Sequence, residues 1–186
     1  MSRLTVIGGT GYAGGYIVAE AARRGHRVIA YSRNAPGTPI AGVEYRQADV
    51  SNLAVLQAAT DGADVVVSAL SPRGDLGGAG QLRRIDSRLA QLAKQSGFRV
   101  GIVGGSGSLL AFEGGPYLID TDQFPADAKP SAIEMGAILE DLRSGDPDVD
   151  WFYVSPAPLF GAWNPGNATG KYRIGGEVLL VGADGS

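Results

Sequence analysis

An apolar run that breaks into closely spaced glycines constrains the fold more than any other part of the chain. Residues 4–7 are typical of a buried strand, and Gly8, Gly11 and Gly14 follow them at three-residue intervals. A helical pattern continues through residues 16–24 and ends at Gly25. Such glycines let the backbone turn tightly and approach a phosphate, while the helix N-terminus attracts the anion. The stretch predicts a strand, a phosphate-binding turn and a helix, as in dinucleotide-binding proteins.

The abundance of glycine leaves a second interpretation of this stretch open. Glycine makes up 29 of the 186 residues, so the turn could also be a connector without a ligand. The strand before the turn and the helix after it favour the dinucleotide interpretation, because the fingerprint occurs in this setting.

Composition and charge exclude several classes of protein. A length of 186 residues fits one domain, and a net charge of −3 gives no reason to expect a nucleic acid as partner. The chain has no cysteine and one histidine, so we expect no disulfide, no thiolate nucleophile and no metal site. His26 precedes the second predicted strand, at the edge of the sheet away from the ligand side. This position argues against a Ser-His-Asp hydrolase.

The location of the protein is predicted from what precedes the first strand. That strand begins at residue 4 and leaves no room for a signal peptide. The chain also has no apolar run approaching the ~18 residues of a membrane span. We therefore expect a cytoplasmic protein with no membrane partner.

Apolar runs alternate with helical patterns along the chain. Further strands are predicted at residues 27–31, 43–46, 64–70, 98–103 and 151–154, with helices after residue 50, over 80–95 and from Pro130. The helix over 80–95 carries arginines at 83, 84 and 88, which we expect to face solvent. This rhythm predicts an α/β fold, a doubly wound and mostly parallel Rossmann-like sheet with strand order 3-2-1-4-5-6.

We expect residues 1–186 to form a single NAD(P)-binding domain. The segment 104–129 has glycines, prolines and acids without periodicity, which predicts a loop over an active site. Residues 171–174 and 178–181 flank Gly175 and Gly176, which predicts a small C-terminal hairpin. The 104–129 loop and the 155–186 segment together are expected to form the substrate side.

The end of the second strand predicts which cofactor is preferred. Folds that prefer NAD usually place an acid there to hold the ribose 2′-hydroxyl. This chain has Ser32 and Arg33 instead, and a guanidinium could pair with a 2′-phosphate. We therefore expect NADP(H) to be preferred over NAD(H), although Arg33 could also be a solvated surface residue. Asp49 could touch the adenine amino group or be an ordinary acid at the start of a helix.

The chain lacks the usual proton donor of short-chain dehydrogenases. In those enzymes a tyrosine precedes a lysine by four residues, and the lysine lowers the tyrosine pKa. None of the seven tyrosines has this partner. The nearest candidates for catalysis are Ser106, which follows the fifth strand, and Tyr117 in the long loop. Ser106 could equally be part of a flexible turn, and Tyr153 is expected to lie in the core.

Several motifs resemble one known family. They are residues 8–14, 31–34, 103–108, 120–121 with 124–125, 154–157, and 170–176 with 179–181. In these the chain is similar to the atypical short-chain dehydrogenases, in their NmrA-like and NADH-flavin reductase group. Such proteins usually continue with another helix. Because this chain stops at Ser186, either the C-terminal end is missing or one face of the sheet is partly uncovered.

The resemblance implies an NAD(P)-binding protein, with the three glycines at the phosphates and Arg33 at the adenosine ribose. The cofactor-binding residues expected from the motifs are Gly8, Thr10, Gly11, Tyr12, Gly14, Ser32, Arg33, Asp49, Val50, Ala69, Leu70, Gly104, Ser155 and Pro156.

The missing proton donor favours one kind of reaction. A flavin or quinone-like acceptor takes a hydride at a ring atom and needs positioning more than a fixed acid. We therefore expect an NAD(P)H-dependent reductase of such an acceptor. A non-catalytic NADP(H)-binding redox sensor with a regulatory protein partner is the alternative. A third possibility is an epimerase or dehydratase. The sequence argues against it, because such an enzyme would need an acid-base pair.

Overall fold

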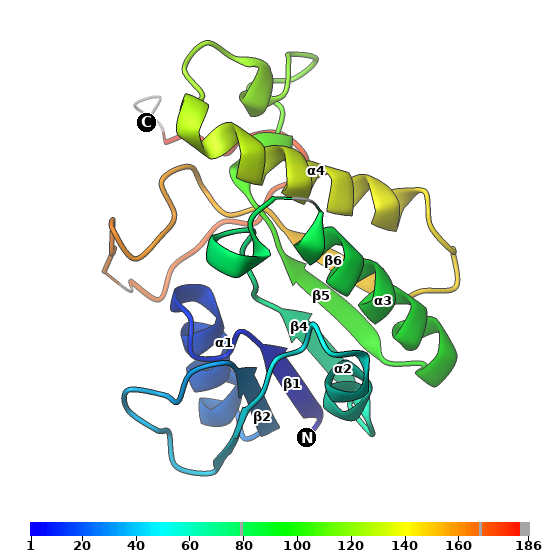
Figure 1. Ribbon diagram of the computed structural model, residues 1–186. Helices are drawn as coiled ribbons and strands as arrows, with labels where there is room; N and C mark the ends of the chain where they lie inside the picture. Colours follow the sequence, from blue (N-terminus) through cyan, green and yellow to red (C-terminus); the bar gives the residue numbers. More distant parts are fainter. Residues whose placement is uncertain (79, 168, 183–186) are drawn as a thin grey trace.

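The sheet has the predicted topology. In the computed structural model, residues 1–78, 80–167 and 169–182 are described. Six strands form one parallel sheet in the order β3-β2-β1-β4-β5-β6 (Figure 1). They are β1 (Arg3–Ile7), β2 (Arg27–Ser32), β3 (Val43–Gln47), β4 (Val65–Ser68), β5 (Arg99–Val103) and β6 (Trp151–Val154).

Helices cover both faces of the sheet and create two cores. They are α1 (Tyr12–Arg23), α2 (Leu53–Thr60), α3 (Gln81–Ser96) and α4 (Lys129–Arg143). One core joins α1 to the sheet through residues such as Val6 and Val18. The larger core joins the sheet to α2, α3 and α4, which lie in front of it in Figure 1, through residues such as Leu56, Leu89 and Ile138. This doubly wound arrangement is the one that the alternation of strands and helices predicts.

The parallel register brings the strand ends together. Ile7 of β1 aligns with Tyr31 of β2 and with Ser68 of β4, and Val103 of β5 aligns with Val154 of β6. Consecutive loops therefore leave the sheet at the same edge, where open α/β sheets bind their ligands. At the other edge the Ser2 amide donates a hydrogen bond to His26 Nδ1 over 3.3 Å, so the histidine lies away from the ligand side.

The predicted C-terminal hairpin is wrong. Within the described residues, 171–174 and 178–181 share no backbone ladder. Instead Leu110 donates to the Glu177 carbonyl over 2.8 Å, and Leu179 donates to the Leu110 carbonyl over 2.9 Å. Tyr172 and Ile174 are more than three-quarters exposed, and an isolated two-stranded hairpin is only marginally stable in water. Pairing with the loop after β5 satisfies the same backbone groups beside the sheet.

The first helix starts earlier than its pattern predicts. It begins at Tyr12 and includes Gly14 and Gly15, which have a low helix propensity and conceal the start in the sequence. In the part of the chain that the structure describes, no helix is long and apolar enough to cross a membrane.

Candidate functional site

A cavity of about 830 Å³ opens at the carboxyl edge of the sheet. Its walls come from the loops after β1, β2, β3, β4, β5 and β6 and from one side of α4. The lining residues are 7–8, 10–13, 31–34, 48–50, 69–73, 76, 103–107, 118, 121, 123–125, 128, 131–132, 135, 156–163 and 179. A cavity of this size at a sheet edge is typical of a cofactor site.

The glycine turn forms the floor of the cavity. Gly8 has φ +80°, and a Cβ there would lie 2.9 Å from the Ala69 carbonyl oxygen, so only glycine fits without strain. A Cβ on Gly14 would lie 2.1 Å from the Gly8 carbonyl oxygen. Gly14 is buried and does not line the cavity. It acts by letting α1 pack directly against the turn.

The N-terminus of α1 opens into the same space. Gly11 is the N-cap and no side chain caps the helix. Gly11, Tyr12 and Ala13 all line the cavity. Uncapped amides and the positive end of the helix dipole favour an anion at this point. The turn and the helix start thus fit the pyrophosphate of a dinucleotide.

One end of the cavity carries the residues predicted to hold the adenosine. Ser32, Arg33, Asp49 and Val50 line it. The Thr10 amide donates to the Ser32 hydroxyl over 3.0 Å, so this hydroxyl links the glycine turn to β2. The Asp49 carboxylate accepts from the Ser51 amide over 2.9 Å, and this bond, helped by the charge of Arg33, lowers the pKa of Asp49. Asp49 is therefore a charged residue near neutral pH.

The other end of the cavity is lined by residues from 104 onward, which contribute no charged side chain, and the Arg73 guanidinium reaches it from the loop after β4. The charged residues along the whole described lining are Arg33, Asp49 and Arg73. From residue 104 onward the lining is glycine, serine, threonine, glutamine and apolar or aromatic side chains. Trp163 lies under the Arg73 guanidinium at 5.1 Å, and the Phe160 ring packs edge-on against Tyr12 at 5.2 Å. The segment 157–163 therefore reaches both sides of the cavity.

Comparison with known proteins agrees with this geometry. Residues 8–180 match a family described as NAD(P)H-binding. The chain belongs to this NAD(P)H-binding family. The match covers the glycine turn, strands β2 to β6 and the segment 157–163, and so includes all the cavity-lining residues except Ile7.

Relatives and solved structures extend the match over the whole chain. The uncharacterised protein YwnB of Bacillus subtilis is 33% identical over 98% of this chain and 84% of its own length. A candidate epimerase of Bacteroides thetaiotaomicron is 28% identical with a TM-score of 0.82, over 99% of this chain and 82% of that one. A candidate NADH-flavin reductase of Streptococcus pneumoniae is 29% identical with a TM-score of 0.78, over 100% and 85%. The resemblance to atypical short-chain dehydrogenases is confirmed.

The structure separates the two residues considered for catalysis. Ser106 lines the end of the cavity formed from residue 104 onward, within a short 3₁₀ turn (Ser106–Ser108). Tyr117 does not line it. The Tyr117 backbone bridges Leu110, and its side chain is 42% exposed. Ser106 therefore lies inside the cavity, whereas Tyr117 lies outside it.

Residues after β5 and β6 are only partly where the motifs predict. Gly104 and Pro156 line the cavity and Ser155 does not. A Cβ on Gly104 would overlap the Tyr153 ring at 2.0 Å. The Tyr153 hydroxyl donates to the Met135 carbonyl over 3.1 Å, and burial raises its pKa to about 12. Tyr153 is thus a core residue, as predicted, and a poor acid at neutral pH.

Sequence reasoning assigned the 104–129 loop and the 155–186 segment to the substrate side without naming the residues there that line the cavity, and it missed Leu76. Leu76, Phe124, Phe160 and Trp163 come from loops without periodicity. The available signal was the occurrence of aromatic residues in proline- and glycine-rich segments that follow strands, since such loops carry binding residues.

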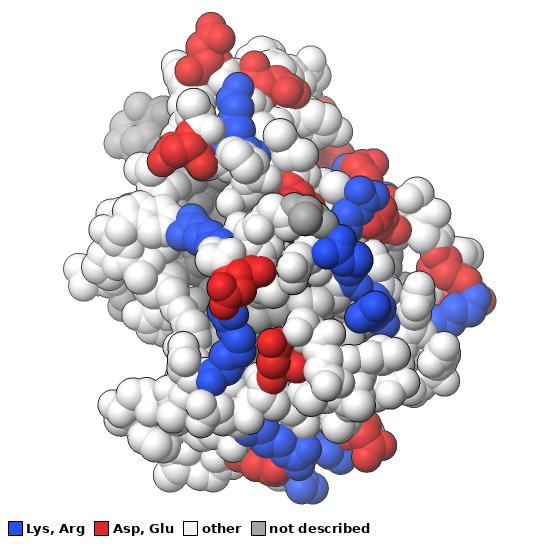
Figure 2. All heavy atoms as spheres, viewed as in Figure 1, with Lys and Arg blue, Asp and Glu red and all other residues white. Residues whose placement is uncertain are grey.

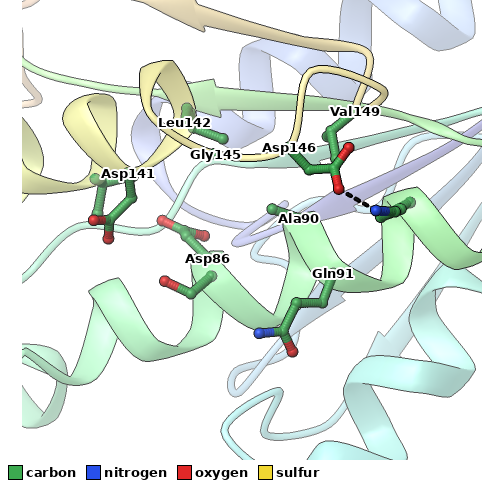
Figure 3. A pocket seen from close by; sticks show the side chains of 11 residues that line it. Asp86, Ala90, Gln91, Asp141, Leu142, Gly145, Asp146 and Val149 are labelled. Carbon is green, nitrogen blue, oxygen red and sulfur yellow. Dashed lines mark hydrogen bonds and ion pairs between the residues drawn. The ribbon is translucent and has the colours of Figure 1, made fainter.

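A second, smaller cavity of about 280 Å³ lies between α3 and α4 (Figure 3). Asp86 on α3 faces α4 and is 2% exposed, and neither of its carboxylate oxygens has a well-formed hydrogen bond. Burial raises the pKa of Asp86 to about 7, with a further contribution from the charge of Glu134. The Glu134 carboxylate accepts from the Arg83 amide over 3.1 Å and so caps α3.

Ion pairs at the rim of this groove correct one prediction. Arg83 does not simply face solvent, because its guanidinium pairs with Asp141 over 2.6 Å. Lys94 pairs with Asp146, as the dashed line in Figure 3 marks. Among the described residues, no cluster of acids and histidine could hold a metal ion. We interpret the smaller cavity as a result of how α3 and α4 pack against each other.

Acidic and basic side chains are both present on the face that holds these helices. Figure 2 shows them in neighbouring positions, including a short run of adjoining basic side chains. The expectation that the protein has no nucleic-acid partner stays a prediction.

Proposed function

We propose that this protein is an NAD(P)H-dependent oxidoreductase that prefers NADPH and reduces a flavin or quinone-like acceptor. The observation that carries the proposal is the aromatic end of the cavity, lined from residue 104 onward, which adjoins the glycine turn and contains no group suited to acid-base catalysis. A planar acceptor fits such a space, because it needs alignment and contact more than a proton donor. The likeness to a candidate NADH-flavin reductase supports this choice.

The nicotinamide, when bound, supplies a hydride to a ring atom of the acceptor. The chain's own residues bind the cofactor and orient the acceptor. The N-terminus of α1 holds the pyrophosphate, and the residues around Arg33 hold the adenosine. The 104–129 loop and the 155–186 segment form the acceptor side through Ser106, Phe124 and residues 156–163. These groups orient the acceptor, and the proton that accompanies the hydride comes from solvent. The cytoplasmic location stays a prediction.

Arg33→Ala should weaken NADPH binding by about 1.5–3 kcal/mol, because a hydrogen bond to a charged group is lost. NADH binding should hardly change, since its ribose carries no 2′-phosphate. Isothermal titration of both cofactors measures the difference. The control is Arg88→Ala, which removes a cation from the exposed side of α3 and should change neither affinity. Equal losses for NADPH and NADH in Arg33→Ala would show that Arg33 does not contact the phosphate.

Ser106→Ala should lower the rate of flavin reduction by only a few-fold, well below the ~10²–10⁴-fold effect of losing a general acid. Ser106 helps to orient the acceptor, and its hydroxyl can be replaced by water. Tyr117→Phe should leave the rate within about twofold, because Tyr117 lies outside the cavity. Steady-state rates with saturating NADPH test both variants. A collapse in either one would identify a proton donor and contradict the proposal.

The experiment for the proposed function is a panel of acceptors mixed with protein and NADPH. Free flavins and quinones should be reduced faster than in buffer, while simple aldehydes and sugars should not react. Tight NADPH binding without turnover on any acceptor would favour the redox sensor instead. Rapid carbonyl reduction or sugar epimerisation would contradict the choice of acceptor.

A further inference from the structure

The guanidinium predicted to meet the 2′-phosphate is already paired with a carboxylate. Arg33 Nη1 lies 2.6 Å from Asp75 Oδ2. Arg33 follows β2, whereas Asp75 belongs to a 3₁₀ turn (Gly74–Leu76) between β4 and α3. Arg33 and Leu76 both line the cavity. The ion pair therefore joins the two sides of its adenosine end.

This ion pair is exposed, so its main effect is not on the fold. The side chains of Arg33 and Asp75 are 48% and 87% exposed, and exposed ion pairs contribute little to stability. The backbone of Arg33 is held separately, because Gln47 Nε2 donates to its carbonyl over 2.9 Å. Removing the Asp75 carboxylate should therefore free the guanidinium without displacing it.

The charges around Arg33 are unfavourable for a phosphate. Asp49 lies close enough for Arg33 to lower its pKa, so Arg33 has carboxylates near it from two different loops. A dianionic phosphate would have to displace Asp75 from Arg33 and would still be repelled by it. A ribose 2′-hydroxyl needs no cation and can donate a hydrogen bond to a carboxylate, as in folds that prefer NAD.

We infer that Asp75 is a cofactor-selectivity residue, which competes with the 2′-phosphate for Arg33 and so limits the preference for NADPH over NADH. The inference rests on the proposed function, in which Arg33 meets the phosphate. It assigns the two sides of the adenosine end opposite effects. Arg33 attracts the 2′-phosphate of NADPH. Asp75 weakens that attraction and does not weaken the binding of NADH.

The test is Asp75→Asn, with binding measured by isothermal titration for NADPH, NADH, 2′,5′-ADP and 5′-AMP. NADPH and 2′,5′-ADP should bind about 5–10-fold more tightly than to the unmodified protein, because the Arg33 guanidinium no longer has to leave a carboxylate to meet the phosphate. NADH and 5′-AMP should bind equally well or more weakly. The gain should shrink in 0.5 M salt, since exposed charges are then screened. It should also vanish when Arg33→Ala is present.

The matched control is Asp61→Asn, which removes an exposed carboxylate at the C-terminal end of α2, just before β4 and so at the edge of the sheet away from the cavity, and should change no affinity. Unchanged NADPH affinity in Asp75→Asn would overturn the inference, and so would an equal gain for NADPH and NADH. Both results leave the proposed function intact if the unmodified protein binds dinucleotide. An unmodified protein that binds neither dinucleotide would overturn the proposed function and this inference with it.

Discussion

Gly11→Val should reduce NADPH affinity by at least ~100-fold while the protein stays folded. The residue is the N-cap of α1 and has ordinary extended angles, with φ −75° and ψ 176°. A Cβ there meets only the Gly8 carbonyl oxygen, at 3.2 Å, so the fold should lose no more than about 1–2 kcal/mol, the usual cost of a poor N-cap. The larger side chain would occupy the space where the pyrophosphate approaches the helix. Losing two hydrogen bonds to a charged group is sufficient for the expected effect.

Two neighbouring glycines make this result specific. Gly15→Ala adds a Cβ 3.9 Å from the nearest atom, within α1 and outside the cavity, so binding should be normal and stability should rise by up to ~1 kcal/mol. Gly14→Ala should instead destabilise the fold, because its Cβ overlaps the Gly8 carbonyl. Fluorescence titration with NADPH and thermal unfolding of all three variants separate binding from folding. Normal affinity in Gly11→Val would mean that the turn is only a connector.

Asp86→Asn should raise stability at pH 8 by about 2–4 kcal/mol and change it little at pH 4. The folded protein keeps the Asp86 proton up to a pKa of about 7, against a usual value of 3.8. Between these values the folded state binds more protons than the unfolded state, so stability falls as the pH rises. Asparagine is neutral throughout and avoids that loss. Denaturant unfolding at both pH values measures the difference.

Asp141→Asn is the control of opposite sign. The hydrogen bond from Arg83 lowers the pKa of Asp141, so its carboxylate contributes stability above the unfolded pKa and loses it as the pH falls. The variant should be less stable than the unmodified protein at pH 7, and the difference should shrink as the pH falls through the lowered pKa of Asp141. If Asp86→Asn were destabilising at pH 8, the buried carboxyl would have a hydrogen-bond partner that outweighs its desolvation.

The sheet was predictable because its central strands are buried on both faces. Residues 65–68 and 99–103 are almost continuous apolar runs, which is typical of central parallel strands. The glycine turn was predictable for a second reason, since only glycine satisfies the geometry at residues 8 and 14. These constraints are local, so the residue types at these positions are enough to predict them.

The remaining features depend on contacts between distant segments. The C-terminal pairing with Leu110 replaced the predicted hairpin, because the choice of partner lay about 70 residues away in the chain. The Arg33–Asp75 pair joins residues 42 positions apart. The sequence around Arg33 does not indicate that Asp75 is its partner, and the sequence around Asp75 does not indicate Arg33. Asp86 had a partial signal, because it is four residues after Leu82 and shares the buried stripe of α3. Its burial without a well-formed hydrogen bond could not be read from that spacing.

The central claim is that a dinucleotide held over the glycine turn reduces an acceptor in the end of the cavity lined from residue 104 onward. An anaerobic single-turnover experiment tests it most directly, with protein, one equivalent of NADPH and one of riboflavin. We expect loss of flavin absorbance in step with NADPH oxidation, many times faster than in buffer and absent in Gly11→Val. Tight NADPH binding with riboflavin reduced no faster than in buffer would contradict the claim.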